Sequence, residues 1–384
     1  MDLSYTPEEE AFRARVRSFL AENLPEVARG RELDLEEGKQ WQRTLHEAGL
    51  LGAAWPKEFG GAGLTDMEQA ILNEEMARAN APAVPGQMGI WWVGPAIMKY
   101  GTDDQKRRFV ARILSGEDIW ATGYSEPNAG SDMYNTQARA EPDGDDYLVN
   151  GQKLWTTIAH LSNWFFCLVR VPVDGAKSKY DGLTVLLMEM HAPGMQVEPI
   201  RQITGGSEFN EVFMKDVRVP KENRLGAEGE GWKIISQALI NERSGIASGL
   251  RFEQSLQSLI RTAKERTRTR DPIARQQLAG LAIGATITKY SGFRSTSDAL
   301  HGRLNPHLSA AMKLYGTSLA QAFSSATLDL FGAYGQLYAD HANAPHSSRA
   351  AMRFLGDCAQ TIAGGTSEIQ KNIVAERILG LPRK

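Results

Sequence analysis

The feature that most constrains this chain is its hydrophobic period, which changes twice along the sequence. Apolar residues recur at helical spacing in residues 1–118, beginning with a helix that the capping box at Thr6–Glu9 opens. Between about Trp120 and Leu225 the apolar runs become short or alternating, as in β-strands, and helical spacing returns from Gly229 onward. The sequence therefore predicts an α+β protein in which a β domain separates two helical regions.

The β pattern contains several short strands with turn sequences beside them. Strands are predicted at Tyr147–Val149, Trp164–Val171, Leu183–Met190 and Val212–Val219. Turns are predicted at Asp143–Asp145, Asn150–Gly151 and Asp174–Gly175. From these patterns we set the domain boundaries at residues 1–118, 119–227 and 228–384.

The last helix of the chain has well-defined predicted limits. Ser367 and Gln370 have the spacing of a capping box, which predicts the start of the helix. Apolar residues follow at helical spacing, and Gly380 is predicted to end the helix.

Charge and composition exclude several classes of protein. The formal net charge is −3, whereas a protein that coats nucleic acid or an anionic membrane is usually basic. No apolar run approaches the ~20 residues of a membrane helix, and the acidic N-terminus does not resemble a signal peptide. The histidines show no metal-ligand spacing, and no nucleophile elbow is present. We therefore expect a cytoplasmic protein without a metal, whose Cys167 and Cys358 stay reduced.

Three segments contain residues suited to a polar, planar ligand. The loop Tyr124–Asp132 combines hydroxyls, small residues and a glycine, although an ordinary turn before a strand explains it equally well. Asn150–Thr157 places Trp155 before two hydroxyl residues, so this indole is either a core aromatic or a wall for a flat cofactor. In Ile362–Glu368 two glycines precede a helix N-terminus, which suits an anionic ligand but is common on its own.

In this order the three segments resemble the acyl-CoA dehydrogenase family, and the resemblance covers nearly the whole chain. Its motifs are Trp55–Pro56, Phe59–Gly61, Tyr124–Asp132, Asn150–Thr157, Phe209–Phe213, Val219–Pro220, Gly229–Trp232 and Ile362–Pro382. The sequence looks most like a bacterial branch that acts on branched, cyclic or steroid-derived acyl-CoAs.

The resemblance implies a fold, a reaction and an assembly. The fold is an N-terminal helical domain, a middle β-barrel domain and a C-terminal four-helix bundle. FAD is expected between the last two domains, with part of its site on a neighbouring subunit. The reaction is oxidation of an acyl-CoA to the 2,3-enoyl-CoA, with electrons passed to an electron-transfer flavoprotein. The assembly is a homotetramer or a mixed tetramer with a sister chain.

Carried over residue by residue, the resemblance also implies the binding residues. The expected cofactor contacts are Thr122, Tyr124, Ser125, Ser131, Trp155, Thr156, Thr157, Thr366 and Glu368. Trp155 is expected to pack near the flavin ring, and Thr157 to form a hydrogen bond near its hydride-accepting nitrogen. Ser131 and Arg243 are expected to contact the CoA, and the Gly364 amide to polarise the thioester carbonyl.

The catalytic base departs from the commonest family pattern, which has a Glu directly before the glycine of the C-terminal Gly-Thr-Ser. Here that position is Gly364, which cannot abstract a proton. A minority of the family instead has the Glu just before the arginine of the first helix of the C-terminal bundle. Glu242 precedes Arg243 at that place and is the predicted base, the alternative being an ordinary helical Glu beside an Arg.

Two further departures affect the part of the FAD site that the family shares between subunits. The family usually has Arg followed closely by Phe-Gly, but Arg266–Pro272 lacks Phe-Gly and could simply be a solvated basic turn. The later Gly-rich element is altered to Phe331–Gly335. Arg268 or Arg270 could still reach the pyrophosphate. A non-catalytic or half-site subunit of a mixed tetramer, and a flavin oxidase or monooxygenase of the same fold, remain alternatives.

The acyl group is expected to be bulky and branched or cyclic. The small residues Gly245, Ala247, Ser248 and Gly249 follow Glu242 closely and leave room beside the predicted base, or equally permit close helix packing. Trp91 and Trp92 lie near the place where the family binds the acyl end, and could form a flat wall for a ring system.

Overall fold

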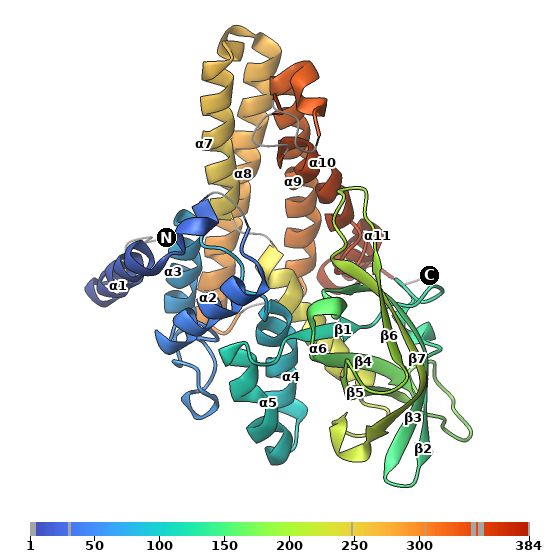
Figure 1. The fold of residues 1–384 in the computed structure, drawn as a ribbon. Coiled ribbons are helices and arrows are strands. Elements are labelled where there is room, and N and C mark those ends of the chain that lie inside the picture. Colours follow the sequence, from blue (N-terminus) through green and yellow to red (C-terminus); the bar gives the residue numbers. More distant parts are fainter. Residues whose placement is uncertain are drawn as a thin grey trace. The chain divides into compact units, whose positions relative to one another are not determined.

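The computed structural model describes residues 5–29, 32–246, 249–303, 305–338, 343–344 and 349–382 (Figure 1). These residues belong to two compact units. The helical unit comprises residues 1–17, 66–80 and 242–384, and the mixed unit comprises residues 18–65 and 81–241. Helices α1 (Pro7–Asn23) and α6 (Gly231–Ile246) contribute residues to both units.

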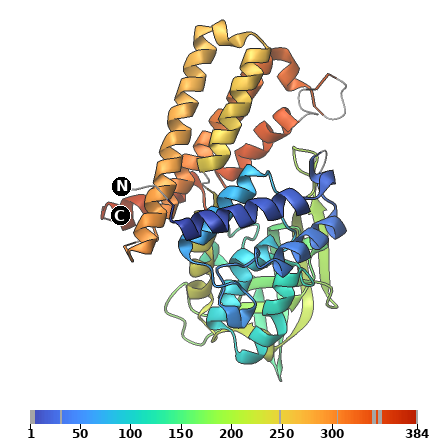
Figure 2. The same ribbon diagram turned by 90° about the vertical axis from the view of Figure 1, so that its left-hand side faces the viewer.

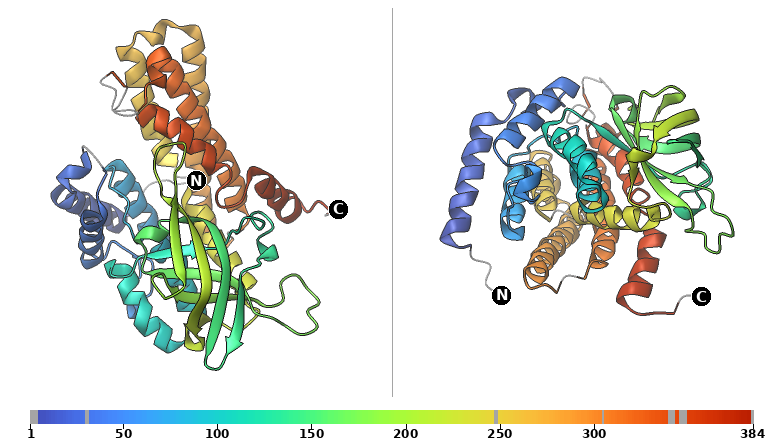
Figure 3. Two further views of the ribbon diagram at one scale, coloured as in Figure 1. Left: turned by 45° about the vertical axis from the view of Figure 1, so that its right-hand side comes forward. Right: turned by 90° about the horizontal axis from the view of Figure 1, so that it is seen from below.

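The mixed unit is built on an eight-stranded sheet (Figure 3). Its strands are β1 (Trp120–Gly123), β2 (Arg139–Asp143), β3 (Asp146–Thr157), β4 (Trp164–Arg170), β5 (Leu183–Glu189), β6 (Met195–Ile200), β7 (Phe209–Pro220) and β8 (Arg224–Leu225). Their order is β6-β7-β3-β2-β4-β5-β8, and β1 pairs with β4. All four strands predicted from the sequence are present, although β3 continues to Thr157, well beyond the predicted Tyr147–Val149.

Strand β4 explains how one sheet serves two cores. Trp164, Phe166 and Leu168 belong to a cluster that includes residues of the helices α4 (Gly94–Tyr100) and α5 (Asp103–Ser115). Phe165, Cys167 and Val169 point to the other face and belong to a second cluster, formed largely by strands. Because β4 is buried on both faces, its sequence is apolar from Trp164 to Val169 instead of alternating. Other helices of this unit are α2 (Leu35–Glu47) and the π-helix η3 (Gly89–Val93).

In the helical unit, four long helices pack in succession and confirm the predicted bundle. They are α7 (Gly249–Glu265), α8 (Pro272–Leu300), α9 (Leu308–Phe331) and α10 (Arg349–Gln360). Figure 2 shows α7 and α8 side by side. The apolar faces of α7, α8 and α9 share a core that includes Phe252 and Phe323, whose rings stack with centroids 5.4 Å apart. Helices α3 (Asp66–Arg78) and α11 (Ser367–Ile373) and the π-helix η9 (Val374–Ile378) also belong to this unit.

The structure confirms one helix start and one turn that the sequence predicts. The Thr6 hydroxyl accepts a hydrogen bond from the Glu9 amide, and the Glu9 carboxylate accepts one from the Thr6 amide, so α1 has the predicted capping box. Asp143–Asp145 forms the turn between β2 and β3, with Gly144 at φ 59°. None of the described helices has the length and hydrophobicity needed to cross a membrane.

The predicted turn at Asn150–Gly151 is wrong. These residues lie inside β3, where the pairing with β7 shifts register between Val149 and Gly151. Asn150 exchanges two hydrogen bonds with Asp216 on β7, which compensates for the interrupted ladder. A side chain at Gly151 would place its Cβ 2.6 Å from the Cα of Ala138. The dipeptide therefore continues the strand opposite a β-bulge, whose extra residue is on β7.

The predicted capping box at Ser367 and Gln370 is also wrong, by one residue. The N-cap of α11 is Thr366, whose hydroxyl accepts a hydrogen bond from the Ile369 amide. Gln370 does not reach back to the cap. Its amide nitrogen donates to the carbonyls of Gly364 and Gly365, because the turn before the helix presents these carbonyls inward.

Candidate functional site

A buried ion pair joins two of the three segments singled out in the sequence. Lys153 on β3 is fully buried, and its Nζ lies 2.7 Å from an Oε atom of Glu126, which is 6% exposed. Lys153 also donates to the Tyr124 carbonyl at 3.3 Å. The Leu154 amide donates to the Ser125 carbonyl at 2.9 Å. The loop Tyr124–Asp132 is therefore fixed directly against the strand segment Asn150–Thr157.

The end of β3 has an unusual backbone conformation. Pairing with β7 shifts between Lys153 and Thr156, and Trp155 within this bulge has φ 61°. Ile158, just beyond the strand, has φ 50°. Bulky and β-branched residues rarely adopt left-handed conformations, and such strain is concentrated at functional sites. The bulge leaves the indole of Trp155 55% exposed, with an edge-to-face contact to Phe209.

Asn210 holds this bulge from the neighbouring strand. Its buried side-chain amide donates to the carbonyls of Thr156 and Glu208, and its oxygen lies 2.9 Å from Nδ1 of His160. Thr156 is itself 1% exposed, and its hydroxyl has no hydrogen-bond partner among the described residues. A buried hydroxyl without a partner costs free energy, so a bound polar ligand would remove that cost.

The third segment lies in the helical unit and is shaped by glycines. Gly364 and Gly365 have φ values of 65° and 93°, which residues with a side chain rarely adopt. Lys313, fully buried on α9, donates to the Gly365 carbonyl at 2.7 Å, and Gln370 donates to both glycine carbonyls. With the carbonyls held inward, the turn leads into the N-terminus of α11.

Comparison with known proteins identifies the family. Residues 6–117, 121–217 and 229–379 match the family models for the acyl-CoA dehydrogenase N-terminal, middle and C-terminal domains. Acyl-CoA dehydrogenase IpdE1 of Mycobacterium tuberculosis is 37% identical to this chain and is matched over 98% of each sequence. This chain belongs to the acyl-CoA dehydrogenase family. The resemblance stated from the motifs is thus confirmed.

Solved structures extend this likeness to the whole fold of the acyl-CoA dehydrogenase. The ChsE4-ChsE5 complex from Mycobacterium tuberculosis has a chain that is 32% identical, with a TM-score of 0.88 and complete coverage of both chains. The structure titled Tcur3481-Tcur3483 steroid ACAD has a TM-score of 0.89 at 28% identity, again with complete coverage. The predicted fold class is confirmed, and the chain is a member of a family of FAD-dependent oxidoreductases.

The residues of the mixed unit fit a flavin on local chemistry. Trp155 offers an exposed aromatic face, Thr156 a hydroxyl without a partner, and Thr157 a half-buried hydroxyl beside them. Tyr124 and Ser125 are half-buried on the adjoining loop, where their carbonyls are already bound. Thr122 on β1 lies within 3.8 Å of the Met88 sulfur, and Ser131 is exposed at the end of the loop. Seven of the nine predicted cofactor residues thus lie in the mixed unit.

The remaining two predicted cofactor residues and Gly364 lie on the turn of the helical unit. Thr366 uses its hydroxyl to cap α11. A hydrogen bond from the Glu368 backbone amide, together with the Thr366 hydroxyl, lowers the pKa of the Glu368 carboxyl. Glu368 is therefore a carboxylate at neutral pH, and suits a ligand hydroxyl better than a phosphate. Glu242 and Arg243 lie on α6, but their side chains are outside the described part of the structure.

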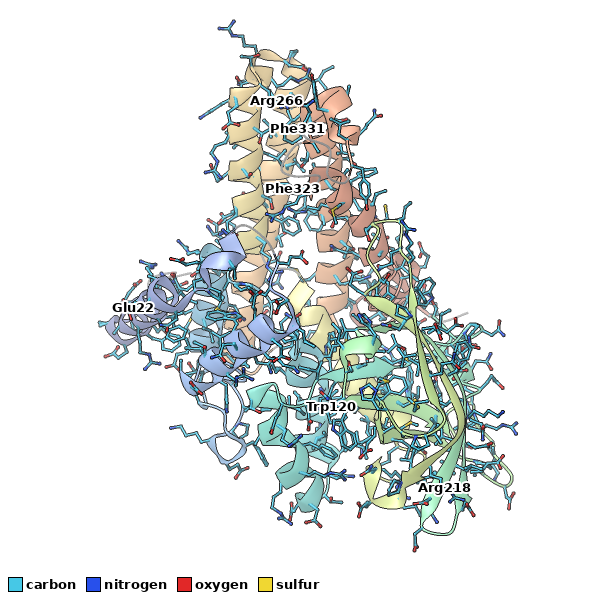
Figure 4. All side chains as sticks on the ribbon, in the orientation of Figure 1. Glu22, Trp120, Arg218, Arg266, Phe323 and Phe331 are labelled. Atoms are coloured by element: carbon cyan, nitrogen blue, oxygen red, sulfur yellow. The ribbon has the colours of Figure 1, made fainter. Side chains whose placement is uncertain are left out.

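The altered basic turn also lies in the helical unit. Arg266 places its guanidinium 4.5 Å from the ring centroid of Phe331 and 5.8 Å from that of Tyr334 (Figure 4). The two altered elements, Arg266–Pro272 and Phe331–Gly335, are thus neighbours at one end of the bundle. Arg268 forms an ion pair with Asp271 at 2.9 Å, so its charge is already partly balanced.

Two other predictions receive partial answers from the structure. Gly249 lies against α8, where a Cβ would come within 2.4 Å of the Cα of Lys289, so this glycine permits close helix packing. Ala247 and Ser248 lie outside the described residues. Trp91 is 44% exposed on η3, with its ring edge-to-face to Trp92. The described residues contain no group of three or more His, Cys, Asp or Glu side chains arranged to hold a metal ion.

Sequence reasoning missed the residues that shape the site: Lys153, Glu126, Asn210 and Lys313. Only Lys153 had a signal in the sequence, because simple alternation places it on the same face of β3 as the buried Tyr147 and Val149. Glu126 lies between Ser125 and Pro127 in a loop, which gives no sign of burial.

Proposed function

We propose that this chain oxidises an acyl-CoA thioester to its 2,3-enoyl-CoA, with Glu242 as the base. The observation that supports this most is the direct attachment of the two flavin segments, with Leu154 donating to Ser125 and Lys153 to Tyr124. This attachment presents Trp155 and Thr157 beside Ser125, as a flavin site requires. FAD, when bound, accepts the hydride that leaves the substrate β-carbon.

The chain's own residues carry the rest of the proposed reaction. Glu242 takes the α-proton, and the double bond forms as the β-hydrogen departs with its electron pair. The Gly364 amide donates to the thioester carbonyl as negative charge develops on that oxygen. Gly364 has φ 65°, and its carbonyl is bound by Gln370, so the orientation of the turn is fixed before substrate arrives. Arg243 and Ser131 bind the CoA portion in this proposal.

A ring-bearing acyl group is the proposed substrate class. The relative whose title names it a steroid ACAD supports this preference. In this chain Trp91 exposes its indole on η3, and Met88, which precedes that helix, contacts Thr122 of the flavin segment. An aromatic surface next to the flavin strand favours flat rings over a flexible straight chain. A substrate panel in which straight palmitoyl-CoA gives the highest kcat/KM would contradict this.

Electron transfer and assembly complete the proposal. We propose an electron-transfer flavoprotein as the acceptor and a tetramer as the working form. A sister chain is the second candidate arrangement, since two similar structures are titled with two chain names and the basic turn of this chain lacks Phe-Gly. Purification of the chain alone, followed by light scattering and by flavin absorbance per subunit, separates the two arrangements.

Glu242→Gln tests the reaction. The variant should retain FAD and bind substrate, but flavin reduction should slow by about 100-fold or more, the contribution of a positioned general base. Glu230→Gln, immediately before the same helix, is the matched control and should reduce flavin at the wild-type rate. Wild-type reduction by Glu242→Gln would rule out this base. Turnover with an artificial acceptor and little peroxide would exclude the oxidase alternative.

A further inference from the structure

The ion pair between Lys153 and Glu126 is an unusual feature of the mixed unit because both groups are buried. Lysine and glutamate are almost never fully buried unless they are paired. Lys153 has no exposed surface, and Glu126 is nearly as buried. Burying two charges costs desolvation free energy that their mutual attraction often does not offset. A role beyond stability would explain why this pair is present.

The pair connects three separate stretches of backbone. Lys153 donates to the Tyr124 carbonyl, on the loop that precedes Glu126. The two carboxylate oxygens of Glu126 accept hydrogen bonds from the amides of Gln137 and Ala138, at 2.7 Å and 3.0 Å. Glu126 also closes its own loop through two backbone hydrogen bonds with Ala129. One buried pair therefore ties the loop to β3 and to the start of β2.

The position of Lys153 links this anchor to the strained bulge. Lys153 pairs with Val212, and it is the last regular pair of β3 before the register shift that ends at Thr156. Holding Lys153 fixes the point at which the bulge begins. The left-handed conformation of Trp155, two residues later, depends on that starting point.

We infer that Lys153 and Glu126 are positioning residues for the cofactor, and that their buried ion pair fixes the spacing between Tyr124–Ser125 and Trp155–Thr157. This inference rests on the proposed function, in which those two segments face the flavin. Neither charged group needs to touch the flavin for this role. The pair instead acts through Tyr124 and Ser125 on one side and through the bulge on the other.

The double variant Glu126→Gln/Lys153→Met tests this role without leaving one charge buried alone. Neutral side chains of similar size should keep the fold, because removing both charges also removes their desolvation penalty. The tether to the Tyr124 carbonyl is lost, so amide hydrogen exchange should become faster in residues 124–132 and 150–157. FAD should bind about tenfold more weakly, the loss of roughly one charge-assisted hydrogen bond, and its visible absorbance should shift.

A matched control is available in the same sheet. Arg218 and Asp143 form an exposed ion pair at 2.9 Å at the end of the β2–β3 hairpin (Figure 4). Arg218 lies opposite Leu148, five residues from Lys153 along β3, or roughly 17 Å at the usual rise per residue. Asp143→Asn/Arg218→Met should leave FAD affinity, absorbance and hydrogen exchange at residues 124–132 unchanged.

The outcomes distinguish this inference from the proposed function. If the wild-type protein, purified together with any sister chain, binds no FAD, the proposed function is overturned. A wild-type protein that binds FAD, with a double variant that matches it in affinity, absorbance and exchange, overturns the positioning role alone. If the double variant does not fold, Glu126→Asp replaces it, since the shorter carboxylate keeps both charges but cannot keep all three contacts. Wild-type FAD affinity and exchange in Glu126→Asp would likewise overturn the inference.

Discussion

Each unit of the molecule contains a buried carboxylate, Glu126 in the mixed unit and Asp357 in the helical unit, and the two have different surroundings. Glu126 in the mixed unit receives an ammonium at 2.7 Å and two backbone amides. Asp357 on α10 is 3% exposed, and one of its oxygens accepts from Gln360. Its other oxygen has no hydrogen-bond partner among the described residues, and lies 3.9 Å from Nε of Arg353. The first carboxylate holds a loop in place, whereas the second is poorly solvated.

The two units also differ in which residues adopt left-handed backbone conformations. In the helical unit the turn uses Gly364 and Gly365 for its left-handed conformations, at little cost in strain. In the mixed unit Trp155 and Ile158 adopt such conformations although their side chains disfavour them. Strong side-chain anchors are therefore needed in the mixed unit, and the glycine turn needs fewer. The predictions below test this contrast through stability in the absence of FAD.

The largest effect is expected for Lys153→Met alone. This change leaves the Glu126 carboxylate buried without its cation, which should lower the free energy of unfolding by about 3–5 kcal/mol. Denaturant unfolding followed by circular dichroism measures the loss. Arg218→Met, which breaks exposed ion pairs with Asp143 and Asp146, should cost no more than about 1 kcal/mol. Equal losses in the two variants would show that burial of the Lys153 pair has no special importance.

A smaller loss is expected for Gly365→Ala. A side chain at φ 93° is strained, so the free energy of unfolding should fall by about 1–2 kcal/mol. Gly280→Ala is the control, since Gly280 lies within α8 and a Cβ there meets open space. That change should stabilise the protein by about 0.5–1 kcal/mol through helix propensity. Thermal unfolding of both variants would reveal the opposite signs, and stabilisation by both would refute the strain.

These two regions also differ in how far the sequence predicted them. The glycine turn was anticipated, because the residue types of Gly364, Gly365 and Thr366 themselves favour a turn before a helix. Only the N-cap was predicted at the wrong residue, by one position. The two β-bulges in the pairing of β3 with β7 were not anticipated. Asn150–Gly151 suggested a turn. The sequence around Trp155 does not indicate a left-handed conformation. That conformation is imposed by pairing with β7 and by Asn210, about fifty residues away in sequence.

Trp155 and Thr157 could be singled out as candidate site residues because they belong to a motif with recognisable chemistry. Lys153 and Asn210 were missed because their roles depend on burial and on partners distant in sequence. The family, its fold and its cofactor could thus be predicted from ordered motifs. The hydrogen bonds that hold those motifs in shape required the structure.

A modest gain in stability is expected for Thr156→Val. Valine has nearly the shape of threonine, and it removes a buried hydroxyl that lacks a partner among the described residues. The protein without FAD should gain up to about 1 kcal/mol in the free energy of unfolding. Thr288→Val is the control. The buried Thr288 hydroxyl donates to the Gly284 carbonyl at 3.0 Å, so its removal should lower the free energy of unfolding. If Thr156 contacts the flavin, the gain should disappear once FAD is bound.

The smallest effect is expected for Asp357→Asn, and its sign depends on pH. Burial raises the pKa of Asp357 above its usual value, although Arg353 and Ser324 partly oppose this. The folded protein therefore holds the proton more tightly than the unfolded chain. The stability due to that proton is complete below the usual Asp pKa, and it is lost as pH rises through the folded-state pKa. Above that range the buried carboxylate costs stability, which an uncharged Asn removes while its oxygen still accepts from Gln360. The Tm of Asp357→Asn should exceed that of the wild type at pH 7, and the difference should shrink as pH is lowered toward 4.

The control is Asp329→Asn, which changes an exposed carboxylate on α9 that accepts from Gln277 and should show no such trend. A variant that is less stable than the wild type at pH 7 would mean that Arg353 pairs with Asp357 strongly enough to offset burial, and the contrast with Glu126 would then fail.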